Sequence, residues 1–208
     1  PNTGSPLWQI INKDADGKVI GTEATSDLNK ATMQEVGSAL PKYMGSITSS
    51  WRYKNFTLSV NAYYLGGNKV YSNNLRFVMN DGHEPYYNQI VLPDDYSIWG
   101  KPGDIASNPS PQNSANSNLT SSRFLKDGSF FSVRNINLSY ELPKHVIRYI
   151  KMEGVVISLS ADNVYTFTGF LGQDPQTTIV SADYSTPGVS DFKYPNNRQF
   201  MLNLNFRF

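Results

Sequence analysis

The amino-acid sequence predicts an all-β fold, namely about five C-terminal strands of a larger antiparallel transmembrane β-barrel. First, apolar and polar residues alternate with a period of two along five segments of the 208-residue chain. Second, the links between these segments are alternately short and long, as in outer-membrane barrels. Third, no apolar run approaches the roughly 18 residues of a membrane-spanning helix, although aromatic residues make up 13% of the chain.

The first two predicted strands form a hairpin. Ile47, Trp51 and Tyr53 share one face of a strand at 43–53, and polar residues occupy the other face. After the two residues Lys54-Asn55 the alternation resumes and continues through 56–66. A link of two residues between such runs is typical of a tight β-hairpin.

Three further strands are predicted at 130–142, 154–165 and 198–208. In the last strand, every second residue from Phe200 to Phe208 is large and apolar, while the intervening residues are mostly polar. A helix cannot sort residues in this way. A final strand that ends on an aromatic residue resembles the assembly signal of bacterial outer-membrane barrels, so Phe208 is predicted to serve the barrel assembly machinery.

Long segments separate the predicted strands at one end only. They cover residues 1–42, 67–129 and 166–197, whereas the links after 53 and 142 are short. A link of about sixty residues without structure of its own is uncommon in soluble sandwiches. Short periplasmic turns and long extracellular loops are the rule in outer-membrane barrels, so we expect the long segments to be extracellular.

Alternation alone does not separate a membrane barrel from a soluble β-sandwich, because a sandwich also buries one face of each strand. Aromatic residues near strand ends favour the membrane, where they form interfacial girdles. The predicted girdle residues are Trp51, Tyr53, Phe200 and Phe206. A soluble or surface-exposed sandwich that acts in adhesion or binding remains the alternative, and a passive porin is another.

Five strands cannot close a barrel, since the smallest natural barrels have eight. Open sheet edges are excluded from lipid because unpaired backbone groups there cost several kcal/mol each. We therefore expect the remaining strands to come from the rest of a longer protein, of which 1–208 is the C-terminal part. The turn-rich opening Pro1-Asn2-Thr3-Gly4 also suggests a sequence that starts within a protein.

Composition and motifs argue against several other functions. The net charge of +1 gives no electrostatic footprint for nucleic acid. The chain has no cysteine, which excludes a disulfide scaffold and thiolate chemistry. His83 and His145 lie far apart, and no pair of acidic residues is placed for acid–base catalysis. We therefore predict that the chain is not an enzyme.

Several short motifs together resemble the C-terminal region of SusC/RagA-type TonB-dependent transporters. Ser132 and the pair Val164-Tyr165 depart from the family pattern, but they do not affect the fold. The resemblance covers most of 1–208 except the segment near 67–120. The matching motifs are Ser122-Arg123-Phe124, Asp127-Gly128-Ser129-Phe130, Arg134-Asn135-Ile136, Leu142-Pro143, Asp162-Asn163, Phe167-Thr168-Gly169, Gly172-x-Asp174-Pro175 and Tyr194-Pro195-Asn196-Asn197-Arg198, with Asp14-Ala15-Asp16-Gly17 and Pro41-Lys42-Tyr43 before them.

The resemblance implies a barrel of about 22 strands with an N-terminal plug, in the outer membrane of a Gram-negative, Bacteroidetes-like bacterium. Family members import glycans, oligosaccharides or peptides with energy from TonB. The implied partners are the remaining barrel and plug, a SusD-like surface lipoprotein, TonB through the absent N-terminal region, and outer-membrane lipid. Such transporter–lipoprotein pairs often dimerise. The sequence does not name the substrate.

The segment Asn12–Glu23 fits the twelve-residue calcium loop at several positions. Asn12, Asp14, Asp16 and Glu23 would supply oxygen ligands, and Gly17 would allow the sharp bend. Calcium is therefore a possible cofactor of this segment. The alternative is an ordinary Asp-Gly turn in a hairpin.

Aromatic residues are concentrated in the predicted extracellular segments. Aromatic faces stack on sugar rings and on peptide side chains, so these residues are candidates for contact with substrate or with the lipoprotein lid. The alternative is packing within the loops. The candidates are Tyr86, Tyr87, Tyr96, Trp99, Phe167, Phe170 and Tyr184.

Overall fold

The computed structural model describes residues 3–149, 152–172, 174–176, 179–180 and 185–208. The chain divides into two compact units. We call Pro1–Gly37 with Ser72–Leu125 the loop unit, and Ser38–Tyr71 with Lys126–Phe208 the sheet unit. None of the helices in the described residues is long and apolar enough to cross a membrane.

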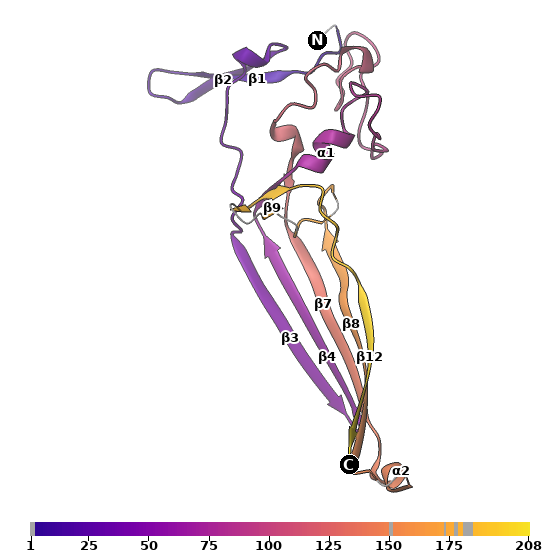
Figure 1. The fold of residues 1–208 in the computed structure, drawn as a ribbon. Coiled ribbons are helices and arrows are strands. Elements are labelled where there is room, and N and C mark those ends of the chain that lie inside the picture. Colours follow the sequence, from indigo (N-terminus) through magenta and orange to yellow (C-terminus); the bar gives the residue numbers. More distant parts are fainter. Residues whose placement is uncertain (1–2, 150–151, 173, 177–178, 181–184) are drawn as a thin grey trace. The chain divides into compact units, whose positions relative to one another are not determined.

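The sheet unit contains a five-stranded antiparallel sheet in which the strands lie in the order β12–β8–β7–β4–β3 (Figure 1). β3 and β4 have the spans that the alternation predicts, and the other three strands differ from the prediction by one to three residues at their ends. The strands are β3 (Tyr43–Tyr53), β4 (Phe56–Gly66), β7 (Phe130–Glu141), β8 (Gly154–Thr168) and β12 (Gln199–Arg207).

Local backbone geometry explains how this sheet turns and bends. Lys54 has a φ of 52° in the two-residue β3–β4 link, as tight hairpins require. The register shifts at Arg134 against both neighbouring strands: β7 has one extra residue against β4, and β8 has one extra residue, within Asn163–Val164, against β7. Asn163, with a φ of 51°, is one of the two residues in the bulge of β8. Bulges of this kind increase the bend and twist of a sheet.

The shorter elements of the sheet unit gather at the two ends of the long strands. α2 follows β7 and lies at the end where the chain terminates, as Figure 1 shows. Two small sheets, β11–β5–β6 and β10–β9, accompany the long strands. Their bounds are β5 (Lys69–Ser72), β6 (Leu125–Asp127), β9 (Ile179–Val180), β10 (Ser185–Thr186) and β11 (Val189–Ser190), with α2 at Lys144–Tyr149.

The loop unit consists of a hairpin, short helices and turns. Ser72 caps α1 by accepting a hydrogen bond from the Leu75 backbone at 3.2 Å. Leu75, Met79 and Phe124 form its buried apolar core. The elements are β1 (Trp8–Lys13), β2 (Val19–Thr25), α1 (Asn73–Val78) and three 3-10 turns, η1 (Leu28–Lys30), η2 (Pro111–Asn113) and η3 (Ser122–Phe124).

The segments predicted as long loops therefore differ from simple loops. Residues 1–42 contain the β1–β2 hairpin, and 67–129 contains β5, α1 and β6. The segment 166–197 begins with the last residues of β8. These elements have short runs and weak periodicity, so alternation alone does not reveal them.

Candidate functional site

The candidate site is the five-stranded sheet, whose two faces differ sharply. The register places residues that are directly opposite each other on the same side. By this criterion one side is apolar across all five strands. Many of its side chains are exposed. This apolar face consists of Tyr43, Ile47, Trp51, Tyr53, Phe56, Leu58, Val60, Ala62, Tyr64, Phe131, Val133, Ile136, Leu138, Tyr140, Val155, Ile157, Leu159, Ala161, Tyr165, Phe167, Phe200, Leu202, Leu204 and Phe206.

Aromatic side chains form a row near each end of the apolar face. The lower row contains Tyr53, Phe56 and Tyr140, with the Phe56 and Tyr140 ring centroids 4.5 Å apart. The upper row contains Tyr64, Phe131 and Phe167, with the last two rings 6.1 Å apart. Aliphatic residues lie between the rows.

The spacing of the rows suits an outer membrane. Phe56 and Tyr64 are eight residues apart on β4, or about 26 Å along a strand. A strand tilt of about 40° shortens this to about 20 Å, near the roughly 25 Å apolar band of outer-membrane barrels. All four predicted girdle residues, Trp51, Tyr53, Phe200 and Phe206, are exposed on this face.

The opposite side, which we call the polar face, is linked by side-chain hydrogen bonds between neighbouring strands. The Asn61 amide donates to Thr48 at 2.7 Å. Ser139 joins Ser158 across β7 and β8 at 2.9 Å. Asn135 donates to the Asp162 carboxylate at 2.5 Å. These bonds satisfy the polar groups while leaving the face hydrophilic.

Charged residues lie on the polar face at the end near α2. Glu141 pairs with Arg52 at 3.5 Å and with Arg207 at 3.8 Å, so that one carboxylate connects β7 with both edge strands. All three side chains are largely exposed, and exposed ion pairs contribute little to stability.

Near the other end, the polar face carries an aromatic and cationic cluster. The Arg134 guanidinium lies over the Tyr63 ring, 4.3 Å from its centroid, and Tyr63 contacts the Phe130 ring at 5.9 Å. Arg134 also donates to the Gln176 side chain at 3.5 Å. The bulge at Arg134 turns this side chain toward the polar face, a placement that strict alternation cannot predict.

A cleft of about 240 Å³ adjoins this cluster in the sheet unit. Asp174 is buried, accepts a hydrogen bond from the Gln176 backbone at 2.9 Å, and accepts another from Asn196 at 3.4 Å. Thr166 contributes its hydroxyl, which hydrogen-bonds to Gln176 at 3.4 Å. The cleft thus offers amide, hydroxyl and carboxylate groups, together with the Arg198 side chain.

The Asp127–Phe130 motif has a structural role. The side chain and backbone of Ser129 donate to Asp127, and with the nearby Lys69 ammonium they hold the pKa of Asp127 below its usual value. The Lys69 and Asp127 atoms are 3.5 Å apart. A Cβ added at Gly128 would collide with Val70 and Asn68, which explains why glycine occupies this position.

In the loop unit, the Ser122–Phe124 motif is held by an ion pair. Arg123 binds Asp81 through two hydrogen bonds of 2.5 and 2.9 Å, and the Asp81 side chain is only 3% exposed. The neighbouring Asn80 accepts from the Gly82 backbone and from Gln89. These contacts fix the start of the segment after α1.

The predicted loop aromatics occupy different environments. Tyr86 and Tyr87 are exposed, and Tyr87 meets Phe77 edge-on at 6.2 Å. Tyr96 is half-buried. Trp99 is half-buried and packs against Gly4, which has a φ of 71° and no room for a Cβ.

The remaining aromatic candidates are in the sheet unit. Phe167 belongs to β8 and to the apolar face rather than to a loop. Phe170 is buried against Gly172, which favours packing over contact with a ligand. Tyr184 lies outside the described residues.

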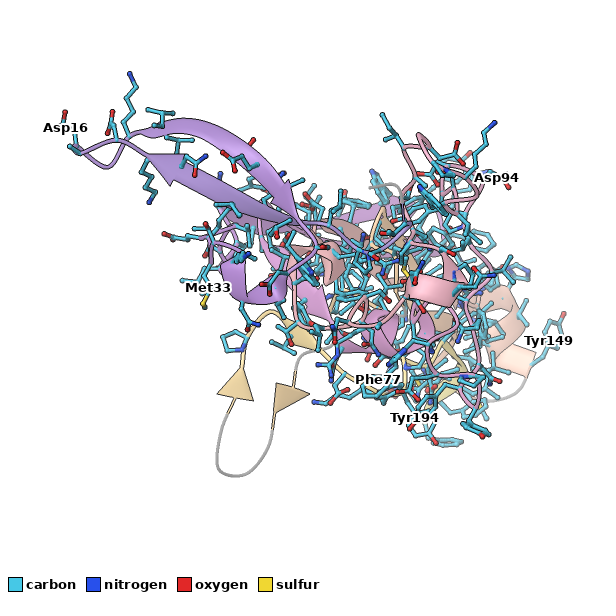
Figure 2. The ribbon with its side chains drawn as sticks, turned by 90° about the horizontal axis from the view of Figure 1, so that it is seen from above. Asp16, Met33, Phe77, Asp94, Tyr149 and Tyr194 are labelled. Atoms are coloured by element: carbon cyan, nitrogen blue, oxygen red, sulfur yellow. The ribbon has the colours of Figure 1, made fainter. Side chains whose placement is uncertain are left out.

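The candidate calcium loop is the tip of the β1–β2 hairpin. The Asp14 carboxylate accepts hydrogen bonds from the Asp16 and Lys18 backbones at 3.1 and 2.8 Å, while Asn12 donates to Glu23 at 2.8 Å. Figure 2 shows Asp16 at the exposed tip. No group of three or more acidic or histidine side chains is placed to hold a metal in the described part of the chain. This geometry favours the ordinary Asp-Gly turn.

Comparison with known proteins identifies the relationship. TonB-dependent receptor P39 of Formosa agariphila is 24% identical over 201 residues, which cover 92% of this chain and 19% of the relative. TonB-dependent receptor P3 of the same organism is 22% identical over 190 residues, covering 89% of this chain and 18% of the relative. The chain is homologous to TonB-dependent receptors. No family model matches it.

Solved structures share the fold of this TonB-dependent receptor homologue. The RagAB peptide importer in its closed-closed state matches with a TM-score of 0.75 and 23% identity, over 99% of this chain and 21% of the importer chain. A second structure of the RagAB peptide transporter matches with a TM-score of 0.72 and 24% identity, over the whole of this chain and 21% of the other. The chain therefore spans about a fifth of the length of its relatives.

Sequence reasoning missed two features of the sheet unit and one of the loop unit. The Arg134–Tyr63 stack depends on a bulge, and the Asp81–Arg123 pair joins residues far apart in sequence. The cleft brings the Asp174 motif together with the Tyr194–Arg198 motif, which the sequence shows only as separate resemblances. The sequence signal that could have indicated this contact is the occurrence of the two motifs together in many related sequences.

Proposed function

We propose that the chain forms five strands of an outer-membrane TonB-dependent transporter of the SusC/RagA type. The apolar face would contact lipid and the polar face would line the barrel lumen. The observation that carries this proposal is the continuous apolar face bounded by two aromatic rows, in a chain homologous to TonB-dependent receptors.

Exposure of the apolar face supports lipid contact. Many of its large side chains, on all five strands, are between 37% (Tyr64) and 71% (Tyr53) exposed. In a soluble sandwich a second sheet would cover such a face at about 10 Å. A lipid bilayer would instead shield this face from water, because hydrocarbon is as apolar as these side chains.

The two edges of the sheet support a larger barrel. In the described residues, β3 and β12 each pair with one neighbour only. Within hydrocarbon the other edge must also be hydrogen-bonded. Further strands of the same transporter would satisfy β3 and β12, and the residues from 1 to 208 would then be its C-terminal portion.

The polar face supports passage of a hydrophilic substrate. Its amide, hydroxyl and carboxylate groups suit a water-filled lumen. The cleft beside Arg134, with Asp174, Gln176 and Asn196, could bind either a saccharide or a peptide backbone through hydrogen bonds. We therefore propose a glycan, oligosaccharide or peptide as cargo, with the exposed Tyr86 and Tyr87 as contacts for substrate or for a lid.

The proposal includes the partners of such a transporter. A SusD-like surface lipoprotein would cap the barrel, TonB would supply energy through a plug outside this chain, and pairs of the two proteins would dimerise. The role is transport rather than catalysis, in agreement with the homology to TonB-dependent receptors.

Fractionation of the native cells tests the proposal. A tag after residue 1 of this region, recovered from detergent-solubilised membranes, should lie in a polypeptide much larger than 23.3 kDa and should bring a lipoprotein with it. Recovery of a soluble 23.3 kDa monomer would contradict the membrane assignment. A large barrel without a plug or TonB box would support the passive porin instead.

A further inference from the structure

We propose that α2 is a phospholipid-binding site, which binds anionic headgroups of the periplasmic leaflet beside the lower aromatic row. This inference rests on the proposed function, because it requires the apolar face to contact lipid. It concerns a surface that the transport mechanism does not use.

The first step places α2 on the apolar side of the sheet. Val155 belongs to the apolar face and is directly opposite Phe206. It is 4% exposed, whereas Ile157 and Leu159, the next residues of the same face, are 37% and 53% exposed. Ile157 and Leu159 have strand partners on both sides, and Val155 lies between Phe206 of β12 and Leu142, just past β7, whose backbone N–H donates to it at 2.9 Å. Backbone neighbours flank all three residues and do not account for the difference.

α2 accounts for this difference. The helix packs against β8, and Figure 1 shows it beside the end of that strand. Its Ile147 is only 5% exposed. The backbone of Ile147 is tied to Pro143 at 3.3 Å and to Met152 at 3.5 Å. We infer that Ile147 packs over the end of the apolar face near Val155, which anchors the helix there.

The second step concerns the charge that the helix displays. Lys144, His145 and Arg148 are exposed and make no ion pair within the part of the chain that the structure describes. The helix itself contains no acidic residue. Glu141, at the end of β7, is already paired with Arg52 and Arg207.

The third step concerns depth in the membrane. Lys144 follows Tyr140 of the lower aromatic row by four residues, so α2 begins just beyond the apolar band. Headgroup phosphates lie at this level. Tyr149 is 89% exposed and points away from the chain in Figure 2, and tyrosine is enriched at this interface. The links at this end are short, which in outer-membrane barrels marks the periplasmic side.

Charge complementarity therefore selects the occupant. An anionic glycerophospholipid offers phosphate to Lys144 and Arg148 and an acyl chain to the apolar face beside Ile147. Each basic residue near an anionic surface strengthens binding about fivefold, so loss of two cations should weaken it roughly twenty-five-fold.

The test measures lipid retained by the complete barrel protein that contains this chain. The purified protein is mixed with equal amounts of phosphatidylglycerol and phosphatidylcholine, and bound lipid is counted by native mass spectrometry. The variant Lys144→Gln/Arg148→Gln is compared with Lys13→Gln/Lys18→Gln. This matched control removes two exposed lysines of the loop unit that make no ion pair with any residue the structure describes.

We expect the wild type and the control to retain phosphatidylglycerol selectively and the α2 variant to lose that selectivity. Equal loss in both variants would show general electrostatic attraction and overturn the proposal. Retention by the α2 variant would overturn it, as would preference for lipopolysaccharide, which marks the other leaflet. A wild-type protein absent from the membrane fraction would instead contradict the proposed function itself.

A second measurement locates the helix directly. The chain contains no cysteine, so Tyr149→Cys adds a single spin-label site to it. Its control is Ile105→Cys in the loop unit, where the native side chain is fully exposed. In bilayers, we expect the label at residue 149 to respond less to a water-soluble relaxing agent than the label at residue 105 does. Equal responses at both sites would refute the proposed position of α2.

Discussion

A charge placed on the apolar face provides the sharpest test of the fold and of the lipid assignment. Val60 lies on β4 midway between Phe56 and Tyr64, four residues from each aromatic row. Four residues span about 13 Å along a strand, which is about 10 Å of depth at a 40° tilt. Val60→Arg would therefore place a guanidinium near the bilayer midplane.

The expected cost follows from this depth. Arginine at the midplane of a transmembrane barrel destabilises it by about 2–4 kcal/mol, and the cost falls to about 0–1 kcal/mol near the interfaces. The control is Ser59→Arg, the adjacent residue on the polar face, which loses only a 3.1 Å hydrogen bond with Ser50. That loss is worth about 0.5–1.5 kcal/mol.

Reversible urea unfolding of the complete barrel in lipid measures both variants. We expect Val60→Arg to lower the free energy of unfolding by about 2–4 kcal/mol, against about 0.5–1.5 kcal/mol for Ser59→Arg. Equal costs for Val60→Arg and Ser59→Arg would refute the two-faced sheet. A neutral Val60→Arg would refute lipid contact.

Four further predictions concern other parts of the chain. Asp81→Ala removes the ion-pair partner of the Arg123 guanidinium, which is 21% exposed. The change should destabilise the loop unit by about 3 kcal/mol and make proteolysis after α1 faster. Unchanged cleavage would contradict this. The Asp127 carboxylate has a lowered pKa, so its stabilising effect should be present above the unfolded pKa of about 3.9 and lost as the pH falls through the folded pKa. The difference in melting temperature between wild type and Asp127→Asn should therefore be present at pH 6 and shrink as the pH falls below the unfolded pKa, and a constant difference would refute the assignment. Deletion of Phe208 should reduce the amount of barrel in the outer membrane, measured by immunoblot, if Phe208 is an assembly signal. Millimolar calcium should leave the melting temperature unchanged, and an increase would restore the calcium interpretation of the β1–β2 hairpin.

Part of the candidate site follows from alternation alone. The two faces of β3, β4, β7, β8 and β12 are predictable because a strand has a period of two, and each residue's face depends only on its parity. The girdle residues Trp51 and Tyr53 follow in the same way. Phe167 was misplaced because the bulge at Arg134 and Asn163 lets β8 extend past Tyr165, and local sequence does not reveal where pairing ends.

The sequence by itself determined the five long strands to within three residues at their ends, the amphipathic character of the sheet and the resemblance to TonB-dependent receptors, because these depend on local periodicity and on short motifs. Only the tertiary structure decided which motifs meet. Asp174 reaches Asn196, and Arg134 reaches Tyr63, through contacts across strands and loops. The contact between α2 and β8 likewise depends on how a short helix folds back on the sheet. Such contacts arise from packing between residues distant in sequence, which no periodic pattern encodes.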